Sequence, residues 1–209
     1  MGDFKINEKT VFTQSGGGEP AMGSTITDIP AAGVTGVLPV GVTGGTGLSG
    51  GIKNASTWRL TANPSTGQDI ELPGAGSAIW EEADTTGAGS IGSAMTVATN
   101  IFTFPATGVW YIGFKFFAAA NGGSRTSANC SINVTLDNSA YAVASLVNFA
   151  AFANNAYCGG NTDFIFDVTN VSTHKCKFAF YTTQGNFDII GSTSYNATSV
   201  TFIRLGDAS

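Results

Sequence analysis

Charged residues are scarce in this 209-residue chain, at 11% of the total, against about a quarter in an average soluble domain. The nine lysines and arginines stand apart from one another, and the formal net charge is -5. A nucleic-acid interface needs clustered cations that release counterions from phosphate groups. The sequence therefore predicts no nucleic-acid partner.

Long apolar runs are also missing. The most apolar stretch, Ala140 to Ala153, is too short to span a bilayer, and Ser145 and Asn148 interrupt it. The first ten residues have neither the basic start nor the apolar middle of a secretory signal, and Ile6 stands where a myristoylation motif has Ser or Thr. We therefore expect no membrane partner and synthesis in a cytoplasm.

Histidine and cysteine, the usual catalytic and metal-binding residues, are few. His174 is the single histidine, and no G-x-S-x-G elbow or Cys-x-x-Cys pair accompanies it. His174 and Cys176 share a strand face, but no third group is placed to orient them. The three cysteines, Cys130, Cys158 and Cys176, are an odd number, which favours buried free thiols over a disulfide.

The densest acidic cluster is formed by Glu81, Glu82 and Asp84. Paired carboxylates can act as general acid and base or bind a hard cation, but no second set of ligands follows at a recognisable spacing. We interpret the cluster as a solvated turn beside Trp80. The sequence thus predicts that the protein is not an enzyme and uses no metal and no cofactor.

Glycine is abundant in the first quarter of the chain. Residues 29 to 51 carry the tetrapeptide GVTG twice and show no periodic apolar face. A collagen-like third-residue period starting at Gly33 and Gly36 fails at Pro39. Isolated apolar residues on such a segment are either disordered or docked on a partner. We predict an extended attachment arm over residues 1 to 52, with contacts by Phe4, Phe12, Ile29, Leu38, Val40 and Leu48.

From about Ile91 onward, short segments alternate apolar and polar residues and end in turn residues, which predicts an antiparallel all-β sandwich. In the segment Cys130 to Leu136, for example, every second residue is apolar and the others are polar. The expected strands are 57–61, 78–82, 94–104, 109–117, 130–136, 140–152, 163–169, 175–182 and 199–205, with a further short strand within residues 1–13 and a break at residues 158–161.

One expected strand is apolar on both sides. Between Val109 and Phe117 the even-numbered positions are apolar, yet Tyr111 and Phe117 make the opposite side apolar too. A strand covered on both faces needs a second packing surface. We predict a subunit interface at Tyr111 and Phe117, the alternative being that the chain's own N-terminal segments cover them.

Three segments carry a resemblance to known families. FTFPATGVWYIGFKF, at Phe102 to Phe116, resembles the signature of the complement-subcomponent and tumour-necrosis-factor class of jelly rolls. TSVTFIRLGD, at Thr198 to Asp207, is similar to the closing strand of virion-associated versions of that fold, and LPVGVTGGTGL, at Leu38 to Leu48, to connectors of bacteriophage fibre proteins. The resemblance implies a jelly-roll β-sandwich that forms a three-fold trimer.

Together these features predict that the arm is followed by a jelly-roll domain over residues 53–209, which is best supported over residues 91–207. The expected function is that of a phage virion structural protein at the virion surface, made in the host cytoplasm. It would be a capsid decoration protein or short head fibre that assembles as a homotrimer and docks on the major capsid protein or another virion component.

Two alternatives remain. One is a tail fibre that recognises a host surface glycan through aromatic and amide groups near loop ends, such as Tyr157, Asn161 or Tyr195. The other is a free lectin-like module.

Overall fold

The computed structural model describes residues 4–6, 9–12, 51–64, 69–74, 79–122, 125–182 and 187–209. The chain divides into two compact units, Met1–Ser49 and Gly50–Ser209. The secondary structure of the described residues consists of strands. Nowhere in these residues is there a helix of the length and apolarity that crossing a membrane requires.

The described part of the first unit is a pair of short strands, β1 (Phe4–Ile6) and β2 (Lys9–Phe12). The two strands pair antiparallel, with Phe4 opposite Phe12. The single short strand predicted within residues 1–13 is therefore a hairpin. Ile29, Leu38, Val40 and Leu48 lie outside the described residues, and the attachment role of all six arm residues stays a prediction.

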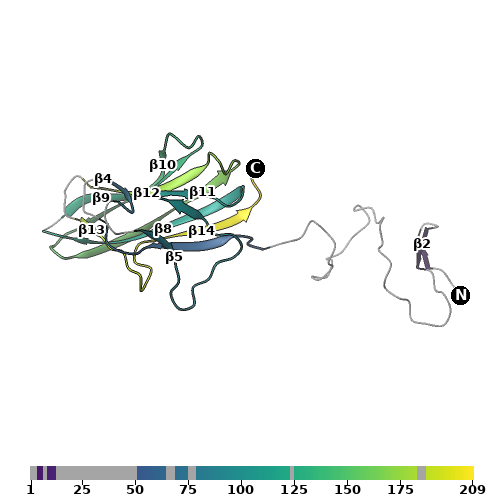
Figure 1. Cartoon of the computed structure of the whole chain (residues 1–209), viewed down its shortest axis with the longest axis horizontal. Coiled ribbons are helices and arrows are strands. Elements are labelled where there is room, and N and C mark those ends of the chain that lie inside the picture. Colours follow the sequence, from purple (N-terminus) through teal and green to yellow (C-terminus); the bar gives the residue numbers. More distant parts are fainter. Residues whose placement is uncertain are drawn as a thin grey trace. The chain divides into compact units, whose positions relative to one another are not determined.

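The second unit is a sandwich of two antiparallel sheets (Figure 1). The first sheet has the order β10 (Ala142–Ala151), β9 (Arg125–Thr135), β12 (Lys175–Thr182), β7 (Ile101–Thr103), β6 (Thr96–Ala98), with β4 (Asp69–Leu72) also paired to β12. The second sheet has the order β11 (Tyr157–Val168), β8 (Gly108–Ala120), β14 (Ser199–Gly206), β3 (Ala55–Leu60), β5 (Trp80–Glu82), with β13 (Phe187–Ile189) also paired to β8.

The chain passes repeatedly between the two sheets. β7 lies in the first sheet, β8 in the second, β9 and β10 in the first, β11 in the second and β12 in the first again. Ser145 of β10 and Thr162 of β11 share a hydroxyl hydrogen bond of 2.5 Å, which links the two sheets along one edge. This arrangement confirms the predicted all-β antiparallel jelly-roll sandwich.

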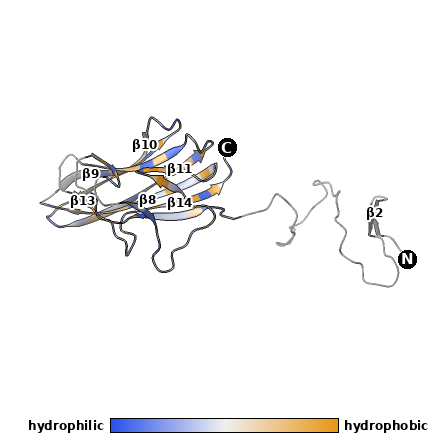
Figure 2. Ribbon diagram, viewed as in Figure 1, coloured by the Kyte–Doolittle hydropathy of each residue, from blue (hydrophilic) through white to orange (hydrophobic). Residues whose placement is uncertain are grey.

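The core between the sheets is rich in phenylalanine, as the alternating patterns predict. Phe102 of β7 is fully buried, and its ring lies 5.2 to 5.7 Å from the rings of Trp58, Trp80, Phe178 and Phe202. Edge-on and tilted contacts of this kind are favourable beyond the area they bury. Hydrophobic and hydrophilic residues alternate along strands such as β11 and β14 (Figure 2) because one side of each strand faces this core.

The segment 94–104 differs from its prediction as one strand. It forms the hairpin of β6 and β7, in which Ala98 pairs with Ile101. Thr99 has a φ of 59°, in the left-handed region. The turn was missed because β-branched residues rarely adopt that conformation and therefore give no turn signal.

The predicted break at residues 158–161 is also wrong, because these residues belong to β11. Gly159 pairs with Phe117 of β8, and Gly160 pairs with Phe116. An added Cβ on Gly159 would lie 2.8 Å from the Phe116 carbonyl oxygen. The glycine is thus a close-approach position within a strand rather than a turn.

Candidate interaction face

The candidate site is the side of the second sheet that faces away from the core, called the outer face here. It is formed by alternate residues of β11, β8, β14 and β3. Along β8 the even-numbered side chains are buried in the core, whereas Tyr111 and Phe117 are partly exposed on the outer face. The structure therefore places both predicted interface residues on one surface.

An apolar row crosses the outer face. Ile165 of β11 pairs with Tyr111 of β8, Tyr111 pairs with Ile203 of β14, and Ile203 pairs with Ala55 of β3. Directly paired residues on one sheet face lie side by side. Ile165 remains 57% exposed, and Tyr111 and Ile203 are partly exposed. Within the described residues, this continuous apolar strip is thus at least partly exposed.

The Tyr111 ring lies over a glycine. Gly113 is the next outer-face position of β8, and a Cβ added there would be 2.9 Å from both Cε1 and Oη of Tyr111. That is closer than carbon atoms approach without displacement, so a side chain at residue 113 would move the ring. The absence of a side chain at Gly113 therefore allows the Tyr111 ring to lie over this position.

A second aromatic group lies farther along the same face. Phe117 of β8 stacks on Tyr157 of β11, with ring centroids 5.3 Å apart and an interplanar angle of 15°. Tyr157 is 69% exposed. The outer face therefore has an apolar strip at Tyr111 and an aromatic stack at Phe117, separated by polar residues.

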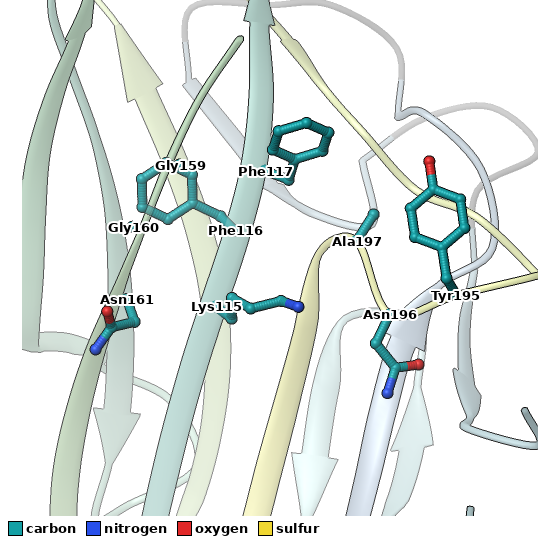
Figure 3. A pocket seen from close by; sticks show the side chains of 9 residues that line it. All are labelled: Lys115, Phe116, Phe117, Gly159, Gly160, Asn161, Tyr195, Asn196 and Ala197. Atoms are coloured by element: carbon teal, nitrogen blue, oxygen red, sulfur yellow. The ribbon is translucent and has the colours of Figure 1, made fainter. Parts of the chain in front are cut away.

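Two adjoining hollows occupy the polar region between these apolar groups, with volumes of about 410 and 400 Å³. Lys115, Asn161 and Asn196 border both, and Phe117 and Tyr195 line the first (Figure 3). The Lys115 side chain extends from β8 between Asn161 and Asn196 (Figure 3). The floor of this region presents amide, hydroxyl and ammonium groups rather than a catalytic pair.

Arg59 is the most buried charged side chain of the described residues, with 1% of its surface exposed. It donates 2.8 Å from Nε to Oε1 of Glu81 and also pairs with Asp84. Burial opposes the charged form of Arg59, but the hydrogen bonds to Glu81 and Asp84 outweigh it and raise the pKa of the guanidinium. Two members of the acidic cluster therefore neutralise a buried cation.

The cysteine thiols and the His174 imidazole are held by packing and hydrogen bonds. Cys130 and Cys176 lie in the core, as their strand phase predicts, and burial raises the pKa of both thiols. Cys158 is half-buried and directs its thiol to the Ala118 carbonyl. The His174 ring stacks on Phe166, and its Nε2 shares a hydrogen bond with the Thr169 hydroxyl. Across the residues that the structure describes, no three His, Cys, Asp or Glu side chains gather as metal ligands.

Part of the outer face was not predicted from the sequence. Ile165 lies on the same side of β11 as Asp163 and Asp167. An apolar residue between two carboxylates on one strand face is the sequence feature that could have indicated this apolar surface. Tyr157 and Asn161, considered as loop-end residues, lie within β11 instead. Asn161 and Tyr195 do line the same hollow.

No protein-family model matches the sequence, and no curated protein matches it. Among solved structures, the chain is similar to murine APRIL at pH 5.0, with a TM-score of 0.50 and 11% identity, covering 72% of this chain and 99% of APRIL. It is also similar to Eiger TNF from S. frugiperda, with a TM-score of 0.50 and 12% identity, covering 74% of this chain and 94% of Eiger. At such identities the similarity concerns the fold, and the chain folds as a TNF-like jelly roll.

Proposed function

We propose that this protein is a non-catalytic structural module that assembles as a homotrimer through the outer face of its second sheet. The observation that carries the proposal is the apolar strip of Ile165, Tyr111 and Ile203, which the described residues leave at least partly exposed. Contiguous apolar surface of this kind marks interaction sites in soluble proteins. A trimer is the assembly that the resemblance to the jelly-roll class implies.

The oligomeric state of the full chain tests this proposal directly. Light scattering coupled to size-exclusion chromatography should report three times the chain mass of 21.3 kDa. Replacing Tyr111 with a charged residue should reduce that mass to one chain. A wild-type protein that stays monomeric at all accessible concentrations would overturn the proposal.

At a finer level we propose a virion role, as a capsid decoration protein or short head fibre whose N-terminal arm docks on a capsid component. The support is the glycine-rich segment up to residue 52 and the fibre-like connector at Leu38 to Leu48. Three arms that attach together raise the effective concentration of each, so the whole unit dissociates slowly even when one arm binds weakly.

Immunogold electron microscopy of virus particles from the source culture tests the virion role. Antibody against the full chain should label the capsid surface. Deleting residues 1–50 should abolish binding to particles while the circular dichroism spectrum keeps its strand signal. Undiminished binding of the truncated protein would contradict the arm, and labelling confined to the tail would favour a tail fibre.

One observation favours a glycan-binding role as a second candidate, either on a tail fibre or in a free lectin-like module. The first hollow combines the rings of Phe117 and Tyr195 with the amides of Asn161 and Asn196, a mixture suited to saccharides. A glycan array with the wild type and with Tyr195→Ala tests this. Saccharide binding that Tyr195→Ala removes would support it, and no binding to any glycan would refute it.

A further inference from the structure

Three neighbouring strands of the outer face, β11, β8 and β14, carry few charges. Their charged residues are Lys115 of β8, Asp163 and Asp167 of β11, and Arg204 of β14. Arg204 pairs with Asp207 at 2.7 Å, and Asp167 accepts hydrogen bonds from Ser209. Two of the four charges are therefore satisfied within the protomer.

Lys115 and Asp163 are the other two. Within the described residues neither has an ion-pair partner inside 4 Å, and both side chains are exposed. Lys115 is paired in register with Asn161, and Asp163 with Gly113, so the two charges are diagonal neighbours on one face. Lys115 nevertheless extends away from β11, toward Asn196 (Figure 3).

Burying these two charges in a subunit interface without partners would be costly, because each would lose its hydration. In a closed ring of identical subunits, a cation on one copy can pair with an anion on the next, and the same contact repeats around the axis. Each buried charge then has a partner that offsets its lost hydration. Among the described residues, β8 and β11 supply one such charge of each sign, close to the apolar strip. The two charges therefore complement those of a second copy.

We propose that Lys115 of one copy pairs with Asp163 of the neighbouring copy, so that three identical ion pairs fix the register of the trimer. This inference rests on the proposed trimer and names the residues that select its geometry. The apolar strip supplies most of the buried apolar area, while the ion pairs disfavour alternative alignments that bring like charges together.

Charge reversal in the full chain tests the pair. We expect Lys115→Asp and Asp163→Lys each to raise the trimer dissociation constant by about tenfold or more, as measured by sedimentation equilibrium. The double variant K115D/D163K should bind within a few-fold of wild type, because it restores the pair with its sign reversed. Lys53→Asp and Glu82→Lys serve as controls, since these residues lie outside β8, β11 and β14, and should leave the constant unchanged.

Salt dependence provides a second measurement that does not rely on charge reversal. Trimer dissociation of the wild type should increase between about 0.05 M and about 1 M NaCl, whereas K115Q/D163N should respond less. Two results would overturn the proposed ion pair when the wild type is a trimer. In the first, each single charge reversal has the same trimer dissociation constant as the wild type. In the second, the double variant associates no more tightly than the single variants. A monomeric wild type instead overturns the trimer itself, and the pair with it.

Discussion

The outer faces of the two sheets differ in how they satisfy their polar and charged groups. On the first sheet, Lys175 of β12 donates to the Thr103 hydroxyl and to the Val171 carbonyl. Lys177 pairs with Glu71 and lies 4.3 Å from the centroid of the Tyr141 ring. These two lysines therefore find their partners within the chain.

On the second sheet, Lys115 and Asp163 have no such partners within the part of the chain that the structure describes, and an apolar strip lies beside them. Both sheets bury their inner faces in the same core, so the difference is confined to the outside. The two faces therefore differ in their lysines: Lys175 and Lys177 of β12 have partners within the chain, whereas Lys115 of β8 has none among the described residues. A charge without a partner beside apolar residues is a composition that suits a polar contact at the edge of an interface.

The largest effect should come from the core that both sheets share. Phe102→Ala removes a ring that contacts four others, and we expect a loss of about 3–5 kcal/mol in the free energy of unfolding. Urea denaturation at one fixed protein concentration measures it. Phe152→Ala is the control, because Phe152 is 81% exposed, and should change stability by less than about 0.5 kcal/mol. Equal losses in both variants would contradict the described core.

The next effect concerns the difference between the two outer faces. Tyr111→Glu places a carboxylate in the apolar strip and should convert trimers to monomers. Tyr181→Glu is the matched change on the first sheet, where Tyr181 is 45% exposed on β12, and should leave the mass unchanged. Light scattering on both variants decides. If Tyr181→Glu dissociates the assembly and Tyr111→Glu does not, the faces have been assigned the wrong way round.

A smaller effect is expected for the ion pair of the first sheet. Lys177→Ala removes the contacts with Glu71 and Tyr141, and partly exposed pairs of this kind contribute about 0.2–1 kcal/mol. Urea denaturation should detect that loss, and sedimentation should detect no change in assembly. A shift in oligomeric state would show that the first sheet's outer face takes part in assembly.

The smallest effect depends on pH and concerns the loop between β9 and β10. Hydrogen bonds from the backbone amides of Ala140 and Ser139, together with the Thr135 hydroxyl, lower the pKa of Asp137 to about 2. The folded pKa lies below the ordinary value of 3.8, so the carboxylate stabilises the fold above about pH 4 and loses this contribution as the pH falls toward 2. The difference in melting temperature between wild type and Asp137→Ala should shrink over that interval, and an NMR titration should locate the pKa directly. A constant difference would contradict this.

Local patterns predicted most of the sandwich because alternation reports which side of a strand is buried. The strands around Cys130, Phe178 and Val200 followed from this period-two signal, and all three side chains lie in the core. The ion pairs of Arg59 with Glu81 and Asp84 were beyond such reasoning, because they depend on β3 pairing with β5 across a long connection. Lys115 was missed for the same reason, since its isolation is visible only once β8 lies between β11 and β14.

Gly113 has a consequence for how this surface can vary. Because the Tyr111 ring rests where a side chain at residue 113 would be, a single methyl group added there would lift the aromatic ring while leaving the backbone pairing of β8 in place. The shape of the surface is therefore controlled by a residue that contributes no side chain to it.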